Sequence, residues 1–495
     1  MFKYCNHLGY VNPYYIEKNG KFVIRRKISE ILNESSNERI IDPIATIELF
    51  NKNYILANRT LIREIQRVPW MAKPNAEYSD WEYFKVPEHG YLDIPEDEIA
   101  SNLFQKICCE IELYIGDKKN IGILLSGGMD SRIVAGTLDY LIKTKRLKGL
   151  NVVAFTWGNS NTRDVVYAKE IASRLNWKWK HFIVTEKDLL NNLTETAMHG
   201  CEYSPIHLHA IPQVRDQNNI DIILGGSYGD SIGRGEYSGT KIENLRPIEQ
   251  NIRNIGNVFD QVIFVQQYKK IIDDIKHYHL LFPRPQEYMQ NELDYQLHYW
   301  RRMLNPCMEL LTERNAAFHQ VFTHPDVFGY LWSIRPFRRN DKIYRFILDF
   351  FHTRLDDIPW ARTGLKYGQL KGTPDNYLKK HHTYSKMIRY DLFEEIKDRA
   401  LSDELSKLGL FNMSAIKTLF KLIKRVPPSG IFFLEKIIWL ASLAEMSVIY
   451  DLKACDSFKK NNSLIDLKTI ISISKDYLIP ATKARFKDVV FKRMS

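Results

Sequence analysis

The sequence has few cysteines and no apolar run long enough to cross a membrane. Its six cysteines among 495 residues form no CxxC pair, which favours a reducing compartment, so we expect a cytoplasmic protein. The most apolar stretch, residues 431–446, contains Glu435, Lys436 and Glu445, and it falls short of the roughly 18 uncharged apolar residues of a spanning helix. We therefore predict a buried helix there. The N-terminal residues also lack the apolar core of a signal peptide.

Internal repeats, low-complexity tracts and blocks of basic residues are also missing from the sequence. Hydrophobic residues make up 44% and charged residues 26%, which is typical of a globular protein. The length allows two or three domains, or one large domain with added helices. The formal charge of +11 favours anionic ligands or a weakly basic surface. Because the Lys and Arg residues are spread along the chain, nucleic acid is the less favoured partner.

Residues 120–138 join a strand, a glycine turn and a helix. Residues 121–125 form a short apolar run typical of a buried parallel strand, and residues 131–145 have helical spacing. Between them lie Ser126, Gly127, Gly128, Met129, Asp130 and Ser131. Glycines let backbone N–H groups turn toward an anion, serines add hydroxyl donors, and the helix presents its positive end. A carboxylate beside phosphates indicates a divalent cation such as Mg²⁺ between them, so Asp130 predicts a metal.

The flanking segments predict an α/β fold with a parallel sheet. Residues 151–156 and 179–184 are expected to be strands, and residues 164–175 between them have the apolar spacing of a helix. This βαβα order requires a parallel sheet with helices on both faces, whose ligands bind at the carboxyl ends of the strands. A fourth strand, residues 220–226, runs into a glycine-rich loop that contains Asp230. Alone, this second loop could be an ordinary turn.

One group of metal-ligating residue types lies between these segments and does not predict a metal site. It consists of His199, Cys201, His207 and His209. Their spacing fits no usual zinc pattern, so packing or substrate contact is the expected role.

The SGGMDS loop resembles the SGGxDS loop of the ATP pyrophosphatases, or PP-loop enzymes, which split ATP into AMP and pyrophosphate while adenylating a substrate. The resemblance implies that Ser126, Gly127, Gly128 and Ser131 hold pyrophosphate. It also implies that the turn of residues 155–158, which includes Thr156, meets the adenine and ribose.

The second loop, residues 225–237, is similar to the GEGSDELFGGY segment of asparagine synthetases, whose aspartate joins the first aspartate on magnesium. The resemblance implies that Asp130 and Asp230 bind Mg²⁺ and that Gly226 lies at the nucleotide. Ser227 and Ser231 replace two acidic residues of the family segment, which is a departure from its substrate-amide chemistry.

The family also has a catalytic lysine, which stabilises charge developing in the acyl-adenylate step. Residues 356–364 fall in the corresponding place, where Arg362 is the nearest match and Lys366 the alternative. An arginine holds a phosphate with two hydrogen bonds but does not lend a proton, which argues against simple asparagine synthesis.

The resemblance divides the chain into three parts. Residues 1–94 are similar to the end of a glutaminase domain and are expected to be β-rich, residues 95–455 form the PP-loop domain, and residues 456–495 form a basic, solvated tail. A glutaminase of this type needs an N-terminal cysteine, whereas Phe2 follows Met1 and the nearest cysteine is Cys5. We therefore expect no glutaminase activity. Ammonia, an amine substrate or a separate glutaminase would supply nitrogen, and a homodimer is the other partner considered.

The function predicted from the resemblance is an ATP-dependent ligase that adenylates a small carboxylate and joins it to an amine. Two alternatives stay open. The first is a PP-loop enzyme that modifies RNA, which the charge of +11 favours. The second is a catalytically degenerate nucleotide-binding protein, which the altered Asp230 loop and the missing lysine favour.

Overall fold

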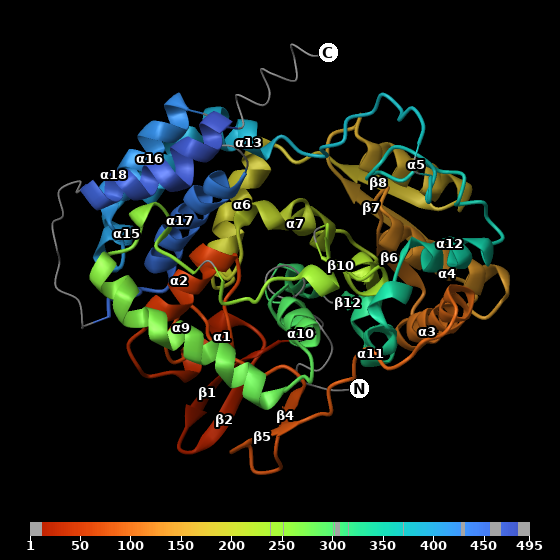
Figure 1. Cartoon of the computed structure of the whole chain (residues 1–495), viewed down its shortest axis with the longest axis horizontal. Helices are drawn as coiled ribbons and strands as arrows, with labels where there is room; N and C mark the ends of the chain where they lie inside the picture. The colour runs from red at the N-terminus through yellow and green to blue at the C-terminus, as the bar shows by residue number, and fades with distance from the viewer. Residues whose placement is uncertain are drawn as a thin grey trace.

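A computed structural model shows a five-stranded sheet on one side of the molecule and a helical layer on the other (Figure 1). The structure describes residues 12–237, 239–250, 252–299, 301, 307–314, 316–369, 371–426, 431–455 and 467–483. Cys5 and Phe2, on which the glutaminase prediction depends, lie outside these ranges.

The main sheet is parallel, as predicted, and the α/β fold class is confirmed. Its strands are β6 (Asn120–Leu124), β7 (Asn151–Trp157), β8 (Lys178–Phe182), β9 (Ile222–Gly225) and β12 (Ala317–Gln320). They lie in the order β12-β9-β6-β7-β8, and every neighbouring pair is parallel. Four of the five strands match predicted ones, and β12 is an additional edge strand.

Alternate residues of these strands supply two hydrophobic cores, one on each face of the sheet. Ile123 and Leu224 point into the large core that also holds α3 (Glu96–Ile115) and α4 (Met129–Lys143). Phe155 and Ile223 point the other way, into a smaller core with α7 (Ile211–Arg215) and η5 (Met308–Thr312). Side chains alternate along a strand, so both faces are covered, and burying each such side chain stabilises the fold by roughly 1.5–3 kcal/mol.

The other helices lie around this sheet and in the helical layer. They are α5 (Arg163–Arg174), α6 (Glu186–Met198), α8 (Gly229–Gly233), α9 (Gln261–Leu281), α10 (Glu287–Tyr299), α11 (Pro325–Ser333), α12 (Asp341–Asp349), α13 (Tyr384–Lys386), α14 (Phe393–Ala400), α15 (Asp403–Lys407), α16 (Met413–Arg425), α17 (Phe432–Ile449) and α18 (Leu467–Ile473).

The N-terminal part contains the expected small β region together with two helices. Strands β1 (Tyr14–Lys18), β2 (Lys21–Arg25) and β3 (Gln66–Arg67) form an antiparallel sheet, and β4 (Ala72–Pro74) pairs with β5 (Trp81–Tyr83). Helices α1 (Ile28–Glu34) and α2 (Pro43–Lys52) follow β2. Phe50 of α2 packs edge-on against Trp439 of α17, with ring centroids 6.2 Å apart. The N-terminal part therefore shares one core with the helical layer.

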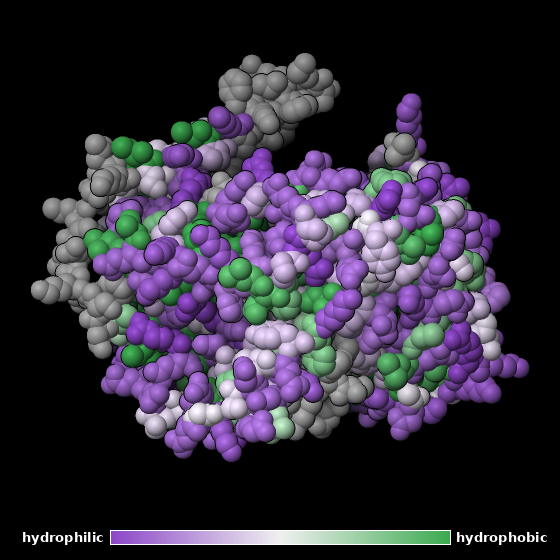
Figure 2. Space-filling view, turned by 60° about the horizontal axis from the view of Figure 1, so that its bottom comes forward, coloured by the Kyte–Doolittle hydropathy of each residue, from purple (hydrophilic) through white to green (hydrophobic). Residues whose placement is uncertain are grey.

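Helix α17 is buried through most of its length, as predicted for residues 431–446. Within the described ranges, no helix combines the length and the apolar composition that a membrane span requires. On the face shown in Figure 2, apolar side chains form separate groups among polar ones.

The expectation of a solvated tail is wrong for residues 467–483. Helix α18 and the turn η9 (Ser474–Leu478) pack on the helical layer, and Tyr477 is buried against Phe433 at 5.1 Å between ring centroids. The Asp476 carboxylate accepts a hydrogen bond of 2.8 Å from the Gly256 backbone N–H. The net basic composition of the segment led to the prediction of a solvated tail, whereas a few apolar side chains such as Tyr477 pack on the helical layer.

Candidate functional site

The two glycine loops meet where the strand order of the sheet reverses. β6 and β9 are neighbours, while the chain continues from β6 to β7 on the other side. At such a switch point the chain leaves neighbouring strands in opposite directions, and a crevice for ligands forms at their carboxyl ends. The first glycine loop (residues 126–131) follows β6, and the second (residues 225–237) follows β9. The loops touch, because a Cβ added to Gly226 would lie 2.8 Å from the backbone of Asp130 and Ser131.

The first glycine loop is held in shape by its own serines. The Ser131 hydroxyl lies 3.1 Å from the Ser126 backbone N–H, from which it accepts a hydrogen bond, and the Gly128 N–H donates to the Ser126 hydroxyl at 3.1 Å. Helix α4 begins at Met129, and its N-cap residue, Gly128, makes no side-chain capping hydrogen bond. The loop therefore offers an uncapped helix N-terminus beside two hydroxyl groups, a favourable place for a phosphate.

A buried arginine fixes this loop to a distant segment. The Arg132 guanidinium donates hydrogen bonds to the carbonyls of Gly127, Leu355, Ile358 and Pro359, at 2.6 to 3.2 Å. Burial lowers the pKa of Arg132 to about 10. A Cβ on Gly127 would lie 2.8 Å from the Arg163 carbonyl, so only glycine fits between these elements. Gly127 therefore serves the packing of the loop, and residues 355–361 are held against it.

Asp130 and Asp230 form an acidic pair between the loops. Burial raises the pKa of Asp130 well above its ordinary value, and the nearby charge of Asp230 adds to the rise. Asp130 Oδ1 is buried and has no hydrogen-bond partner among the described residues. The side chain of Asp230 is 46% exposed, and its Oδ2 lies 3.3 Å from Arg234 Nη2. A buried carboxylate oxygen without a donor, beside a second carboxylate, suits a bound cation.

The donor set fits Mg²⁺ better than a metal held by the protein alone. In the described ranges there is no group of three or more His, Cys, Asp or Glu side chains that could hold an ion. Mg²⁺ is usually bound by one or two carboxylates together with substrate phosphates and water, and the acidic pair with a phosphate at the first loop would provide this set.

The loops open into a cavity of about 310 Å³, the main cavity, which lies within the size range of small-ligand sites. Ser126, Gly128, Asp130, Ser131 and Gly226 line it. Thr156 and Trp157 at the end of β7 also line it. The Thr156 hydroxyl is already engaged, since it donates to the Leu125 carbonyl at 2.8 Å and accepts from Trp179 Nε1 at 3.1 Å. Thr156 therefore shapes the wall.

The structure separates the two candidates for the family lysine. A second cavity of about 290 Å³, the side cavity, is lined by Asp130, Asp230 and Arg362. Arg362 lies over the Trp360 ring at 5.4 Å and its Nη2 is 2.6 Å from Glu236 Oε1. Lys366 lines neither the main nor the side cavity, and its ammonium pairs with Asp357 at 3.0 Å. The chain thus brings Arg362, and not Lys366, to the acidic pair.

Four ionisable residues that line these two cavities were not predicted as site residues: Asp164, His209, Lys379 and His381. Lys379 and His381 come from a strap, residues 375–382, that crosses the β7–α5 loop. The Arg163 and Asn159 backbone N–H groups donate to the carbonyls of Leu378 at 2.9 Å and His381 at 2.8 Å. For His209 the sequence indicates only packing or substrate contact.

Asp164 links the strap to the first glycine loop. A Cβ on Gly127 would lie 3.1 Å from the Cα atom of Asp164, and Asp164 Oδ2 lies 3.9 Å from His381 Nδ1. Burial raises the pKa of Asp164 and lowers that of His381. His381 therefore favours its neutral, proton-accepting form beside the loop.

Comparison with known proteins finds a family match over the part of the chain that contains both glycine loops. Residues 115–325, less than half of the chain, match the asparagine synthase family model. No curated protein matches the sequence. The solved structures with similarity include the U34-tRNA thiolase NcsA from Methanococcus maripaludis with its [4Fe-4S] cluster, at 12% identity over 41% of this chain and 80% of that chain (TM-score 0.22).

A second similar structure is NMN synthetase from Francisella tularensis, at 15% identity over 57% of this chain and 100% of that chain (TM-score 0.20). Both TM-scores are low, so the similarity to a known family rests on the sequence match alone. Both glycine loops and the acidic pair lie inside the matched range, whereas Arg362 and the strap lie beyond it. The two glycine loops and the acidic pair thus lie in the part of the chain that is similar to the asparagine synthase family.

Proposed function

We propose that the protein is an ATP-dependent ligase that adenylates a small carboxylate and transfers the acyl group to an amine. In the first step a carboxylate oxygen attacks the α-phosphorus of ATP, the bond to the bridging oxygen breaks, and pyrophosphate leaves. In the second step the amine nitrogen attacks the acyl carbon, AMP leaves, and the nitrogen loses a proton. The products are AMP, pyrophosphate and a compound with a new C–N bond.

The first glycine loop would bind the pyrophosphate portion of ATP. The Ser126 and Ser131 hydroxyls and the amides at the start of α4 face the main cavity and offer donors to phosphate oxygens. Mg²⁺, held by Asp130 and Asp230, would neutralise charge on the phosphates. The acidic pair then has a direct role, because it orients the phosphate chain relative to the loop.

Positive side chains in the side cavity would stabilise the charge that develops at the α-phosphate. Arg362 and Lys379 both line this cavity beside the acidic pair. A fixed cation at this position lowers the barrier only where charge increases in the transition state. We assign this role to Arg362 first, since the Glu236 contact at 2.6 Å already orients its guanidinium.

His381 is the candidate base for the proton that the amine gives up. It lines the main cavity, is kept neutral by burial, and lies 3.9 Å from an Asp164 carboxylate that would stabilise its protonated form. The amine proton would pass to a ring nitrogen of His381 as the C–N bond forms.

One observation carries the proposal: a phosphate-type loop and an unpaired buried carboxylate oxygen face the same cavity at the strand switch point. The experiment is ATP–pyrophosphate exchange with purified protein, Mg²⁺ and a panel of carboxylic acids. Exchange that depends on one acid, together with AMP as the nucleotide product, would support the ligase. ADP as the sole product would contradict it. ATP binding with no exchange for any acid would favour the degenerate nucleotide-binding protein.

A further inference from the structure

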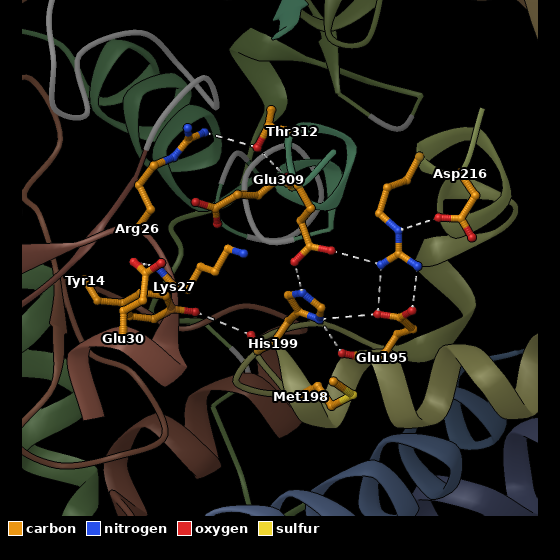
Figure 3. Close-up of polar contacts among 12 residues, drawn as sticks. Tyr14, Arg26, Lys27, Glu30, Glu195, Met198, His199, Asp216, Glu309 and Thr312 are labelled. Carbon is orange, nitrogen blue, oxygen red and sulfur yellow. Dashed lines mark hydrogen bonds and ion pairs between the residues drawn. The ribbon is translucent and has the colours of Figure 1, made fainter. Parts of the chain in front are cut away.

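A larger cavity lies away from both glycine loops, where the N-terminal part meets the helical layer. It has a volume of about 540 Å³ and we call it the N-terminal cavity. The start of α1, the C-terminal end of α6 and the turn η5 form its walls, with Tyr14 of β1 and Tyr450 after α17. Figure 3 shows charged side chains from these separate elements directed toward a common space. Nothing in the proposed reaction uses them.

One end of this cavity is a closed ionic network. Arg215 donates to both Glu195 and Glu313, at 2.8 and 3.0 Å, and His199 Nε2 lies 2.6 Å from Glu313 Oε1. The hydrogen bond to Glu313 helps to raise the pKa of His199 against the effect of burial, so His199 favours its charged form. Arg215 also pairs with Asp216 at 3.0 Å, and Arg314 pairs with Asp216 at 3.2 Å. Three cations then balance three carboxylates, so this end has little capacity for a charged ligand.

The opposite end has unused charge of both signs. Among the described residues, Lys27 and Arg26 form no ion pair at contact distance; the Arg26 guanidinium donates to the Thr312 hydroxyl at 3.1 Å, and its charge acts on Glu309 from a longer distance. Glu309 faces this end from η5, and its Oε1 is buried without a hydrogen-bond partner among the described residues. In Figure 3 the Glu309 carboxylate lies between the side chains of Arg26 and Lys27.

The buried neighbour of Glu309 does not satisfy this carboxylate. Arg67 lies 3.4 Å from Glu309 Oε2 but is closer to Glu202, at 3.1 Å. Arg301 also pairs with Glu202, at 3.0 Å. Arg67 is thus shared between two carboxylates, and Glu309 Oε1 still requires a donor from the cavity.

We propose that the N-terminal cavity binds a small zwitterion such as an amino acid, with its carboxylate on Arg26 and Lys27 and its ammonium on Glu309. A simple anion would leave Glu309 Oε1 without a donor, and a simple cation would lie beside two unpaired positive charges. A molecule with both groups satisfies all three side chains. This inference does not depend on the proposed ligase reaction.

The turn η5 connects this second site to the main cavity. Met308 lines the main cavity, while the next residue, Glu309, lines the N-terminal cavity together with Thr312. Because Met308 and Glu309 are adjacent in the chain, a ligand that displaces Glu309 would also displace Met308 at the wall of the main cavity. Binding at one cavity is therefore expected to change affinity at the other, and by thermodynamic reciprocity the change is equal in both directions.

The test is calorimetric titration of the full chain, without ATP, with each of the proteinogenic amino acids. For the amino acid that binds, N-acetylated and carboxamide analogues are titrated in the same way, and each is expected to bind the wild type about tenfold more weakly. In Glu309→Gln the free amino acid should bind as weakly as its N-acetyl analogue. In Lys27→Met it should bind as weakly as its carboxamide.

One matched variant shows whether the loss of affinity is specific to Glu309 and Lys27. Glu30→Gln removes an exposed carboxylate at the rim of the same cavity and should not alter amino acid affinity. The proposal is overturned if no amino acid binds, if the N-acetyl analogue binds the wild type as well as the free form, or if only phosphate or pyrophosphate binds. Equal losses in Glu30→Gln and Glu309→Gln would also overturn it. The comparison of the free amino acid with its two analogues needs only wild-type protein, so it tests the proposed zwitterion site even if a variant does not fold.

Discussion

Asp130 and Asp230 lie close together where the two glycine loops touch, since both line the side cavity and a Cβ on Gly229 would lie 3.0 Å from the carboxyl carbon of Asp130. This contact joins residues 100 positions apart, and it exists because β6 and β9 are neighbours in the sheet. Two carboxylates held this close, one of them buried, repel each other unless a cation or a proton lies between them. The predictions below follow from this arrangement and from the side chains around it.

The first prediction concerns the Mg²⁺ dependence of ATP binding. In Asp130→Asn the acidic pair loses one charge, so wild-type protein should bind ATP at least about tenfold more tightly with Mg²⁺ than without it, and the variant should lose most of this difference. Calorimetric titration of both proteins, each with Mg²⁺ and with a chelator, measures the effect. Four equal affinities would rule out the metal site.

The second prediction concerns stability against pH in the absence of metal. Because the pKa of Asp130 is raised on folding, the unfolded chain releases this proton first, at a pH of about 4. The free energy of unfolding should therefore fall as the pH rises from about 4 toward the raised folded-state value, and Asp130→Asn should lack this part of the decrease. Chemical unfolding at a series of pH values, with a chelator present, tests this. Parallel curves for the two proteins would contradict it.

The third prediction separates the two candidate cations. Arg362→Ala should reduce ATP–pyrophosphate exchange by about a hundredfold, because it removes a positive charge beside the acidic pair. Lys366→Ala is the matched change at a side chain that pairs with Asp357 outside both cavities, and it should leave exchange within about twofold. A larger loss in Lys366→Ala than in Arg362→Ala would assign the role to the lysine.

The fourth prediction tests the contact between the loops. Gly226→Ala would place a Cβ 2.8 Å from the Asp130 and Ser131 backbone, so the loops must move apart, at a cost of roughly 1–3 kcal/mol in unfolding free energy. The matched variant is Gly128→Ala, whose Cβ would lie 3.0 Å from one serine side-chain oxygen. It should destabilise less in the same denaturant titration, and equal losses would contradict the proposed contact.

Much of the fold could be predicted because local patterns coincided with the tertiary arrangement. The apolar runs at β6, β7 and β9 are short and uninterrupted, as expected for strands buried on both faces. Strand β12 was missed because its sequence, AFHQ, has two polar residues in four and lacks a β-branched one. It is a strand because Ala317 to Gln320 pair with β9 along the edge of the sheet. That pairing depends on residues about 95 positions away.

The candidate site could be predicted only where the residues that form it are close together in the sequence. The loop of residues 126–131 carries its own signal in six consecutive positions, whereas Lys379 and His381 reach the site through a strap more than 200 residues later. The sequence shows two adjacent histidines, His381 and His382, but it does not show which side chains they contact. Only the backbone hydrogen bonds between the strap and the β7–α5 loop place His381 opposite Asp164.

The last prediction tests His381 by separating the two halves of the proposed reaction. A base for the amine acts only after the acyl-adenylate has formed, so His381→Gln should leave ATP–pyrophosphate exchange close to the wild-type rate while slowing C–N bond formation by about a hundredfold. Glutamine keeps much of the volume and the hydrogen bonding of the side chain but accepts no proton at neutral pH. Asp164→Asn should give a smaller loss in the same step, since it acts through His381.

The pH dependence provides an independent readout for the same residue. Because burial lowers the pKa of His381, the neutral form dominates at pH 7, and the rate of C–N bond formation should fall only when the pH drops below the ordinary histidine range. In His381→Gln this acid limb should disappear from the profile. If exchange and C–N bond formation decline together in the variant, His381 contributes to nucleotide binding and another group accepts the proton.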